Sequence, residues 1–149
     1  MTPSIVTTRR QLTAVIKVAS PFDRIAQTQR TARATLAAAL PSLDTGALGR
    51  TCTRWTPPAN GMLPMEIGLI VARPFAASGE VVPSELPAGR AAHFQLRGPF
   101  DGLPGAWQAL FDWCKAERLS LAGINWEIYS SWKGADPKTL NTDLYALLA

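Results

Sequence analysis

One short module occurs twice in this sequence, and the duplication is the feature that most restricts the folds open to the chain. Each copy has a strand-like run, then a Pro-Phe-Asp tripeptide (residues 21–23 and 99–101), then a helical pattern and two more strand-like runs. This order, repeated, predicts an α+β protein. The expected strands are residues 15–19, 50–56, 65–72, 91–96, 124–130 and 141–148, and the expected helices are residues 21–40 and 104–118.

A single module has three strands and one helix, so its sheet would leave an apolar face open. Two modules related by a pseudo-twofold axis can pair their sheets. We therefore expect a duplicated strand–helix–strand–strand module that forms a curved antiparallel sheet, with two helices on one face and a ligand groove on the other. The whole chain, residues 1–149, is expected to be one domain, with repeat one at about 9–75, a linker rich in Pro, Gly and Ser at 76–89, and repeat two at about 90–149.

The second predicted helix has its large apolar residues at the spacing of one helical face. We expect these side chains to be buried against the sheet. They are Trp107, Leu110, Phe111 and Cys114.

Composition excludes several classes of function. The net charge of +4 comes from 15 basic and 11 acidic residues without a basic block. Arg24, Arg30 and Arg33 on the first helix are more typical of a solvated helix face than of a phosphate-binding patch. One histidine, His93, argues against a metal site, a histidine-based triad and haem. No cofactor is expected.

The first residues of the chain and the distribution of apolar residues indicate where in the cell the protein is expected. No apolar run approaches the ~18 residues of a membrane span, and the first residues lack a signal-peptide pattern. Cys52 and Cys114 match no redox or metal spacing. We expect a cytoplasmic protein, without a membrane partner, that is a monomer or weak dimer.

The strand at residues 124–130 carries the most informative candidate site. Its alternation separates an apolar set from Glu127 and Tyr129. If the apolar set packs against the helices, Glu127 and Tyr129 face the groove, where a carboxylate beside an aromatic hydroxyl suits a lipophilic cation. The alternative is a solvent-facing glutamate on a half-exposed strand. The apolar set consists of Ile124, Trp126 and Ile128.

Other candidates are weaker. Alternation turns Glu66 away from the apolar face of its strand, toward the same groove, and Gly68 beside it either leaves room for a ligand or marks a bulge. Trp55, Trp132 and Phe75 stand at strand ends, where an aromatic ring can line a pocket mouth or simply pack at an edge. Glu66 and Glu127 could also form an acid/base pair.

Three segments together resemble the GyrI-like small-molecule-binding domains. They are Ala92 to Phe100 (AHFQLRGPF), Trp126 to Tyr129 (WEIY) and Thr142 to Tyr145 (TDLY), with the aromatic-rich helix between the first two. That family includes the effector-binding domains of multidrug-sensing transcription activators and stand-alone gyrase-modulating proteins. The resemblance covers nearly the whole chain.

The resemblance implies a ligand site between the two halves. Glu127 matches the pocket glutamate that pairs with cationic drugs in the family, and Tyr129 lies beside it. Some stand-alone members resemble hydrolases of cyclopropane-bearing alkylating toxins, in which Glu127 would be the catalytic base. Residues 1–14 are too few for a helix-turn-helix, so we expect no direct DNA binding, and a role in transcription regulation would need a partner chain.

Three functions follow from these observations. The leading one is a stand-alone small-molecule-binding protein for hydrophobic, cationic or amphipathic ligands. The alternatives are a hydrolase of strained electrophiles and a gyrase-inhibitor-like protein–protein modulator that acts through the basic first helix.

Overall fold

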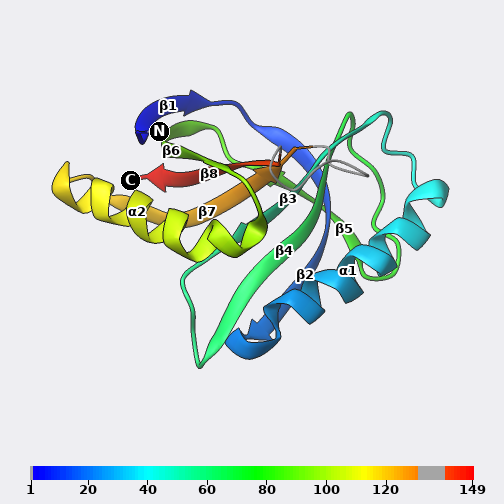
Figure 1. The fold of residues 1–149 in the computed structure, drawn as a ribbon. Coiled ribbons are helices and arrows are strands. Elements are labelled where there is room, and N and C mark those ends of the chain that lie inside the picture. The colour runs from blue at the N-terminus through cyan, green and yellow to red at the C-terminus, as the bar shows by residue number, and fades with distance from the viewer. Residues whose placement is uncertain (1, 131–139) are drawn as a thin grey trace.

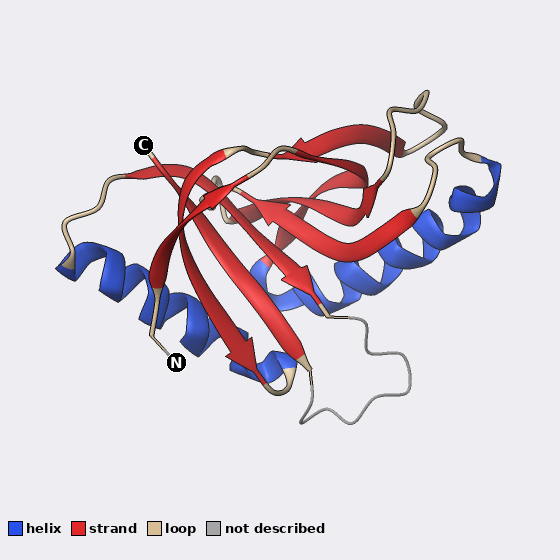
Figure 2. Ribbon diagram, turned by 90° about the horizontal axis from the view of Figure 1, so that it is seen from above, coloured by secondary structure: helices blue, strands red, loops and turns tan. Residues whose placement is uncertain are grey.

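Eight strands form one antiparallel sheet in the computed structural model, which describes residues 2–130 and 140–149. Two helices cover one face of this sheet (Figures 1 and 2), so the expected α+β class is confirmed. The strands are β1 (Ser4–Thr8), β2 (Gln11–Pro21), β3 (Leu48–Trp55), β4 (Met62–Val71), β5 (Val81–Leu86), β6 (Gly89–Arg97), β7 (Leu121–Tyr129) and β8 (Asn141–Leu148). The helices are α1 (Ile25–Ala39) and α2 (Leu103–Ala116).

The two Pro-Phe-Asp tripeptides have the same structural role. Each leads into a short 3₁₀ turn, η1 (Phe22–Arg24) and η3 (Phe100–Gly102), and each turn continues directly into a helix. Proline sets the backbone angle that a turn needs just before a helix. The repeated tripeptide therefore marks the strand-to-helix junction in both halves.

The strand order is β1-β6-β8-β7-β3-β4-β2-β5, which is symmetric about the β3–β7 pair. β6, β8 and β7 come from the second half of the chain, and β3, β4 and β2 from the first. The outer strands are exchanged: β1 pairs with β6, and β5 pairs with β2. Each half therefore has an edge strand that comes from the other half. On this ground we propose that the chain is one domain containing two repeats.

The prediction of six strands was therefore short by two. β5 lies inside the segment expected to be a linker, and β1 lies ahead of the first expected strand. β5 contains Pro83, which reads as a loop residue but is tolerated on an edge strand such as this one. Both segments become strands because they pair with strands far away in the sequence, β1 with β6 and β5 with β2.

The face of the sheet opposite the helices is covered by the chain itself. Leu86, at the end of β5, packs against Ala91 of β6 and Trp126 of β7. Arg54 of β3 reaches across to donate a hydrogen bond to the backbone oxygen of Glu85, at 2.7 Å. The middle of this face is thus a second hydrophobic core.

The helices build two clusters on the other face, and Trp55 of β3 packs against both. In α2 the side chains of Trp107, Leu110 and Cys114 are buried as their spacing predicts, whereas Phe111 is only partly buried. Within the described parts of the chain, neither helix is long and apolar enough to cross a membrane.

Candidate functional site

Glu127 and Tyr129 face α2, the reverse of the orientation expected from sequence. The indole Nε1 of Trp107, on α2, donates a hydrogen bond to Glu127 Oε2 at 2.6 Å. The alternation along β7 was correct, but its apolar set, which includes Trp126, packs on the opposite face of the sheet. The expectation failed because both faces of β7 are buried near its end, so the more apolar set need not be the one against the helices.

Glu127 is the end point of a chain of hydrogen bonds. The Tyr129 hydroxyl lies 2.5 Å from Glu127 Oε1 and 2.9 Å from Thr53 Oγ1. Because one hydroxyl can donate only once, we infer that Tyr129 donates to Glu127 and accepts from Thr53. Thr53 in turn accepts from Gln29 Nε2 (3.1 Å) and Arg33 (3.2 Å) of α1. Every donor in this chain points toward the carboxylate.

The two aromatic side chains that donate to Glu127 belong to a larger cluster of aromatic rings. The ring of Trp55 meets Trp107 edge-on at 4.9 Å and Phe111 at 6.2 Å, while Trp107 and Phe111 stack at 5.3 Å. Phe100, just before α2, meets the ring of Tyr129 at 5.6 Å. The structure therefore brings Trp55, Tyr129 and Glu127 of the predicted set together between the helices.

The side of α1 that faces this cluster carries Gln29 and Arg33, one turn apart. The Arg33 guanidinium carbon lies 5.3 Å from the centroid of the Tyr129 ring. The Gln29 Oε1 atom is buried and has no hydrogen-bond partner in the described part of the chain. Such an atom is an acceptor that a ligand donor could satisfy.

Burial governs the ionisation of the cluster. Removal from solvent raises the pKa of Glu127, while the hydrogen bonds from Tyr129 and Trp107 and the charge of Arg33 act in the opposite direction. The pKa of Tyr129 is raised well above its usual value by burial and by the neighbouring Glu127 charge. Tyr129 therefore keeps its proton and remains a donor to the carboxylate.

The raised pKa of Glu127 predicts how the stability of the protein depends on pH. In the unfolded chain the carboxyl group titrates near 4.5; between that pH and its native pKa, the unfolded state releases a proton that the native state keeps. Rising pH therefore favours unfolding, and the contribution of the neutral carboxyl group is lost as the pH passes the native pKa. We expect the stability of Glu127→Gln relative to the parent protein to increase as the pH rises through this range, because the amide has no proton to lose.

Urea unfolding between about pH 4 and pH 8 measures this difference. The matched control is Glu117→Gln, at an exposed position after α2, which should follow the profile of the parent protein. Parallel stability curves for Glu127→Gln and the parent protein would show that Glu127 does not bury a charge.

Glu66 does not belong to this cluster. It lies on the face opposite the helices, as predicted, where Ser84 Oγ donates to its Oε1 at 2.5 Å and Arg54 Nε lies 4.0 Å from its Oε2. Because Glu127 is on the helix face, the expectation that both carboxylates share a groove is wrong. The expected acid/base pair is excluded for the same reason.

Gly68 makes room for backbone rather than for a ligand. A Cβ atom at Gly68 would collide with the carbonyl oxygen of Ala14 on the neighbouring strand β2. The residue therefore permits the close approach of β2 and β4.

Phe75 is not part of this cluster. Phe75 packs at the far end of the first-half core and lines a hollow of about 200 Å³ with Leu12 and Pro83. Trp132 lies outside the described residues.

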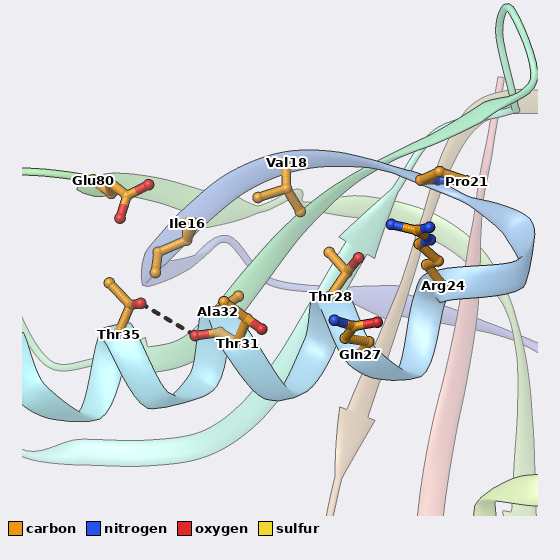
Figure 3. A pocket seen from close by; sticks show the side chains of 10 residues that line it. All are labelled: Ile16, Val18, Pro21, Arg24, Gln27, Thr28, Thr31, Ala32, Thr35 and Glu80. Atoms are coloured by element: carbon orange, nitrogen blue, oxygen red, sulfur yellow. Dashed lines mark hydrogen bonds between the residues drawn. The ribbon is translucent and has the colours of Figure 1, made fainter.

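A larger hollow, of about 340 Å³, lies on the other side of α1, between this helix and β2 (Figure 3). Ile16 and Val18 of β2 form its apolar side, and Thr28 and Thr31 face them from the helix. None of the ligand-binding candidates from the sequence lines it, although Pro21 of the first tripeptide and Arg24 of the basic set do.

A polar cluster ties the two halves together on the face opposite the helices. Asp143 of β8 accepts from Arg50 of β3 at 3.1 Å and lies 2.8 Å from His93 Nε2. Arg50 also donates to the backbone oxygen of Tyr129 at 2.8 Å. The hydrogen bond with His93 and the one from Arg50 lower the pKa of Asp143, against its partial burial. No group of three metal-ligating side chains occurs in the described residues.

Sequence reasoning did not identify Thr53, Gln29 or the link from Trp107 to Glu127. It assigned Arg33 to a solvated helix face, which is wrong, because this side chain is partly buried against Thr53 and Tyr129. Gln29 and Arg33 are four residues apart on a helix, which places them on the same side. That spacing was a usable signal. Thr53 has no comparable signal, because only the pairing of β3 with β7 sets it opposite Glu127.

Comparison with known proteins identifies the family and the fold of this chain. A family model described as "GyrI-like small molecule binding domain" matches residues 1–148. The C-terminal domain of EcmrR has a similar structure, with a TM-score of 0.80 and 14% identity over 99% of this chain and 96% of that one. In an EcmrR–DNA complex (TM-score 0.83, 14% identity), 98% of this chain matches and spans 56% of the EcmrR chain, about half its length.

Two further structures are similar. SAV2435 bound to tetraphenylphosphonium matches with a TM-score of 0.70 and 14% identity over 100% of this chain and 94% of that one. A hydrolase from Listeria innocua matches with a TM-score of 0.61 and 12% identity over 99% and 92%. At these identities the structures show a common fold alone. No curated protein sequence matches the chain.

Proposed function

This chain belongs to the family of GyrI-like small-molecule-binding domains, and on that premise we propose that it binds a hydrophobic cation between α1 and α2. The ligand lies over β3 and β7, with Glu127 as its counter-charge and Trp55, Trp107 and Tyr129 as its aromatic walls. The same proposal keeps Glu127 and Tyr129 as ligand-binding residues and places the ligand on the helix face of the sheet.

One observation carries this proposal. Glu127 is only 8% exposed, and its carboxyl group accepts hydrogen bonds from two aromatic side chains, Trp107 and Tyr129. An anion in such surroundings gains more from a cation than it would in water, and ring faces attract the same cation. A hydrophobic cation that carries aromatic rings satisfies both requirements.

The comparison with SAV2435 favours a ligand of this type. That protein has been solved with tetraphenylphosphonium, a cation covered by four aromatic rings. The same cation is therefore a suitable probe for this chain.

We expect Glu127→Gln to weaken the binding of tetraphenylphosphonium by about tenfold to a hundredfold, because the amide keeps the shape of the site and removes its charge. Tryptophan fluorescence titration measures the dissociation constant, since Trp55 and Trp107 border the site. Glu66→Gln is the matched control, because Glu66 lies on the opposite face of the sheet. This variant should bind the probe with the affinity of the parent protein. Equal affinity of Glu127→Gln and the parent protein would remove Glu127 from the binding site.

The raised pKa of Glu127 also favours a second candidate, hydrolysis of an electrophile with a strained ring. In this reaction Glu127 takes a proton from water, the water oxygen bonds to a ring carbon, and the ring carbon–carbon bond breaks. The electron pair released passes to the acceptor group conjugated with the ring, which is then protonated. Glu127→Gln would abolish this turnover while an uncharged substrate still binds.

A further inference from the structure

The guanidinium of Arg33 occupies the face of Tyr129 on which a ligand cation would stack. We propose that Arg33 is a displaceable internal cation, which balances the charge of Glu127 and must leave before a cationic ligand binds. This inference rests on the proposed function and adds a residue that sets the affinity and selectivity of the site.

The first step is position. Arg33 projects from α1 toward β3 and β7, where its guanidinium carbon lies 5.3 Å from the Tyr129 centroid. This is within the ~6 Å over which a cation is attracted to an aromatic ring. Tyr129 donates directly to Glu127, so a cation at this place also sits in the field of the carboxylate.

The second step is the weakness of the attachment. The side chain of Arg33 donates to the Thr53 hydroxyl at 3.2 Å, a neutral acceptor that Gln29 also uses. Within the described ranges no carboxylate lies within 4.0 Å of it, whereas Arg50 has an ion pair with Asp143 at 3.1 Å. An arginine held by one neutral hydrogen bond and a ring face is easily displaced.

The third step is exclusion. Two cations cannot share one ring face, and their repulsion grows in a site shielded from water. A ligand cation must therefore replace Arg33. Its binding free energy is reduced by the interactions with Tyr129 and Glu127 that Arg33 gives up. A neutral ligand of similar shape does not compete for the charge of Glu127.

The test compares Arg33→Met with the parent protein, using tetraphenylphosphonium as the cationic probe and triphenylphosphine oxide as a neutral aromatic probe. We expect Arg33→Met to bind tetraphenylphosphonium about tenfold more tightly, and to change the affinity for triphenylphosphine oxide by less than about twofold. Arg30→Met is the matched control: it lies on the same helix, is exposed, and should change neither affinity.

Arg33→Gln is the second variant, and near-ultraviolet circular dichroism confirms that each variant is folded. It should also tighten the binding of the cation. A gain of equal size for both probes would overturn the inference, because it would show that Arg33 only fills space. Weaker or unchanged binding of the cation would overturn it as well, since Arg33 would then support the ligand or play no part.

Failure of the proposed function gives a different result. If neither the parent protein nor the folded Arg33 variants bind tetraphenylphosphonium, the binding function fails and this inference fails with it. If only the variants bind, both stand, and Arg33 is a stronger competitor than expected.

Discussion

Trp107→Ala is expected to lower the free energy of unfolding by about 3–5 kcal/mol and to abolish measurable binding of tetraphenylphosphonium. The Trp107 indole is buried, packs against Trp55 and Phe111, and donates to Glu127. Its removal leaves a cavity, takes away one wall of the site and deprives a buried carboxylate of a donor. Urea unfolding and fluorescence titration measure the two effects.

Trp107→Phe separates packing from hydrogen bonding. Phenylalanine keeps much of the apolar surface but has no N–H group, so the loss of stability should be smaller and the native pKa of Glu127 should rise further. An unchanged urea midpoint for Trp107→Ala would contradict the packing of α2 on the sheet.

Trp126→Ala should cost a similar amount, about 3–5 kcal/mol, for a different reason. Trp126 is 1% exposed and stacks on Tyr145 at 5.2 Å, with 11° between the rings, on the face opposite the helices. If that face were open to solvent, the same truncation would cost little. Urea unfolding of Trp126→Ala therefore tests whether the second core exists.

The comparison of the two tryptophan variants tests the assignment of the faces of β7. Folded Trp126→Ala should still bind tetraphenylphosphonium, because its side chain is on the other side of the sheet from Glu127. Trp113→Ala, a partly buried position on α2, serves as a control for tryptophan removal in general and should cost clearly less. Loss of cation binding in folded Trp126→Ala would contradict our placement of the ligand on the helix face of the sheet.

Much of this arrangement could be read from local patterns. The two Pro-Phe-Asp tripeptides located the helix starts, and the spacing of Trp107, Leu110 and Cys114 predicted the buried face of α2. Alternation in β4 correctly placed Glu66 away from the helices. These features depend on residues close together in the chain, so their period carries the information.

The sequence alone determined the family, the fold class and the pairing of Glu127 with Tyr129 on one side of a strand. Tertiary structure decided which side that was. Exchange of β1 and β5 between the halves brings Leu86 onto the face opposite the helices. The part of that face around Leu86 is then buried too, and Trp126 occupies it. Because alternation reports only that two sets of side chains diverge, it cannot choose between two buried faces. Pairing of β3 with β7 places Thr53 opposite Glu127, and the packing of α1 on the sheet places Arg33 over Tyr129. The composition of the site therefore depends on contacts between residues far apart in the chain.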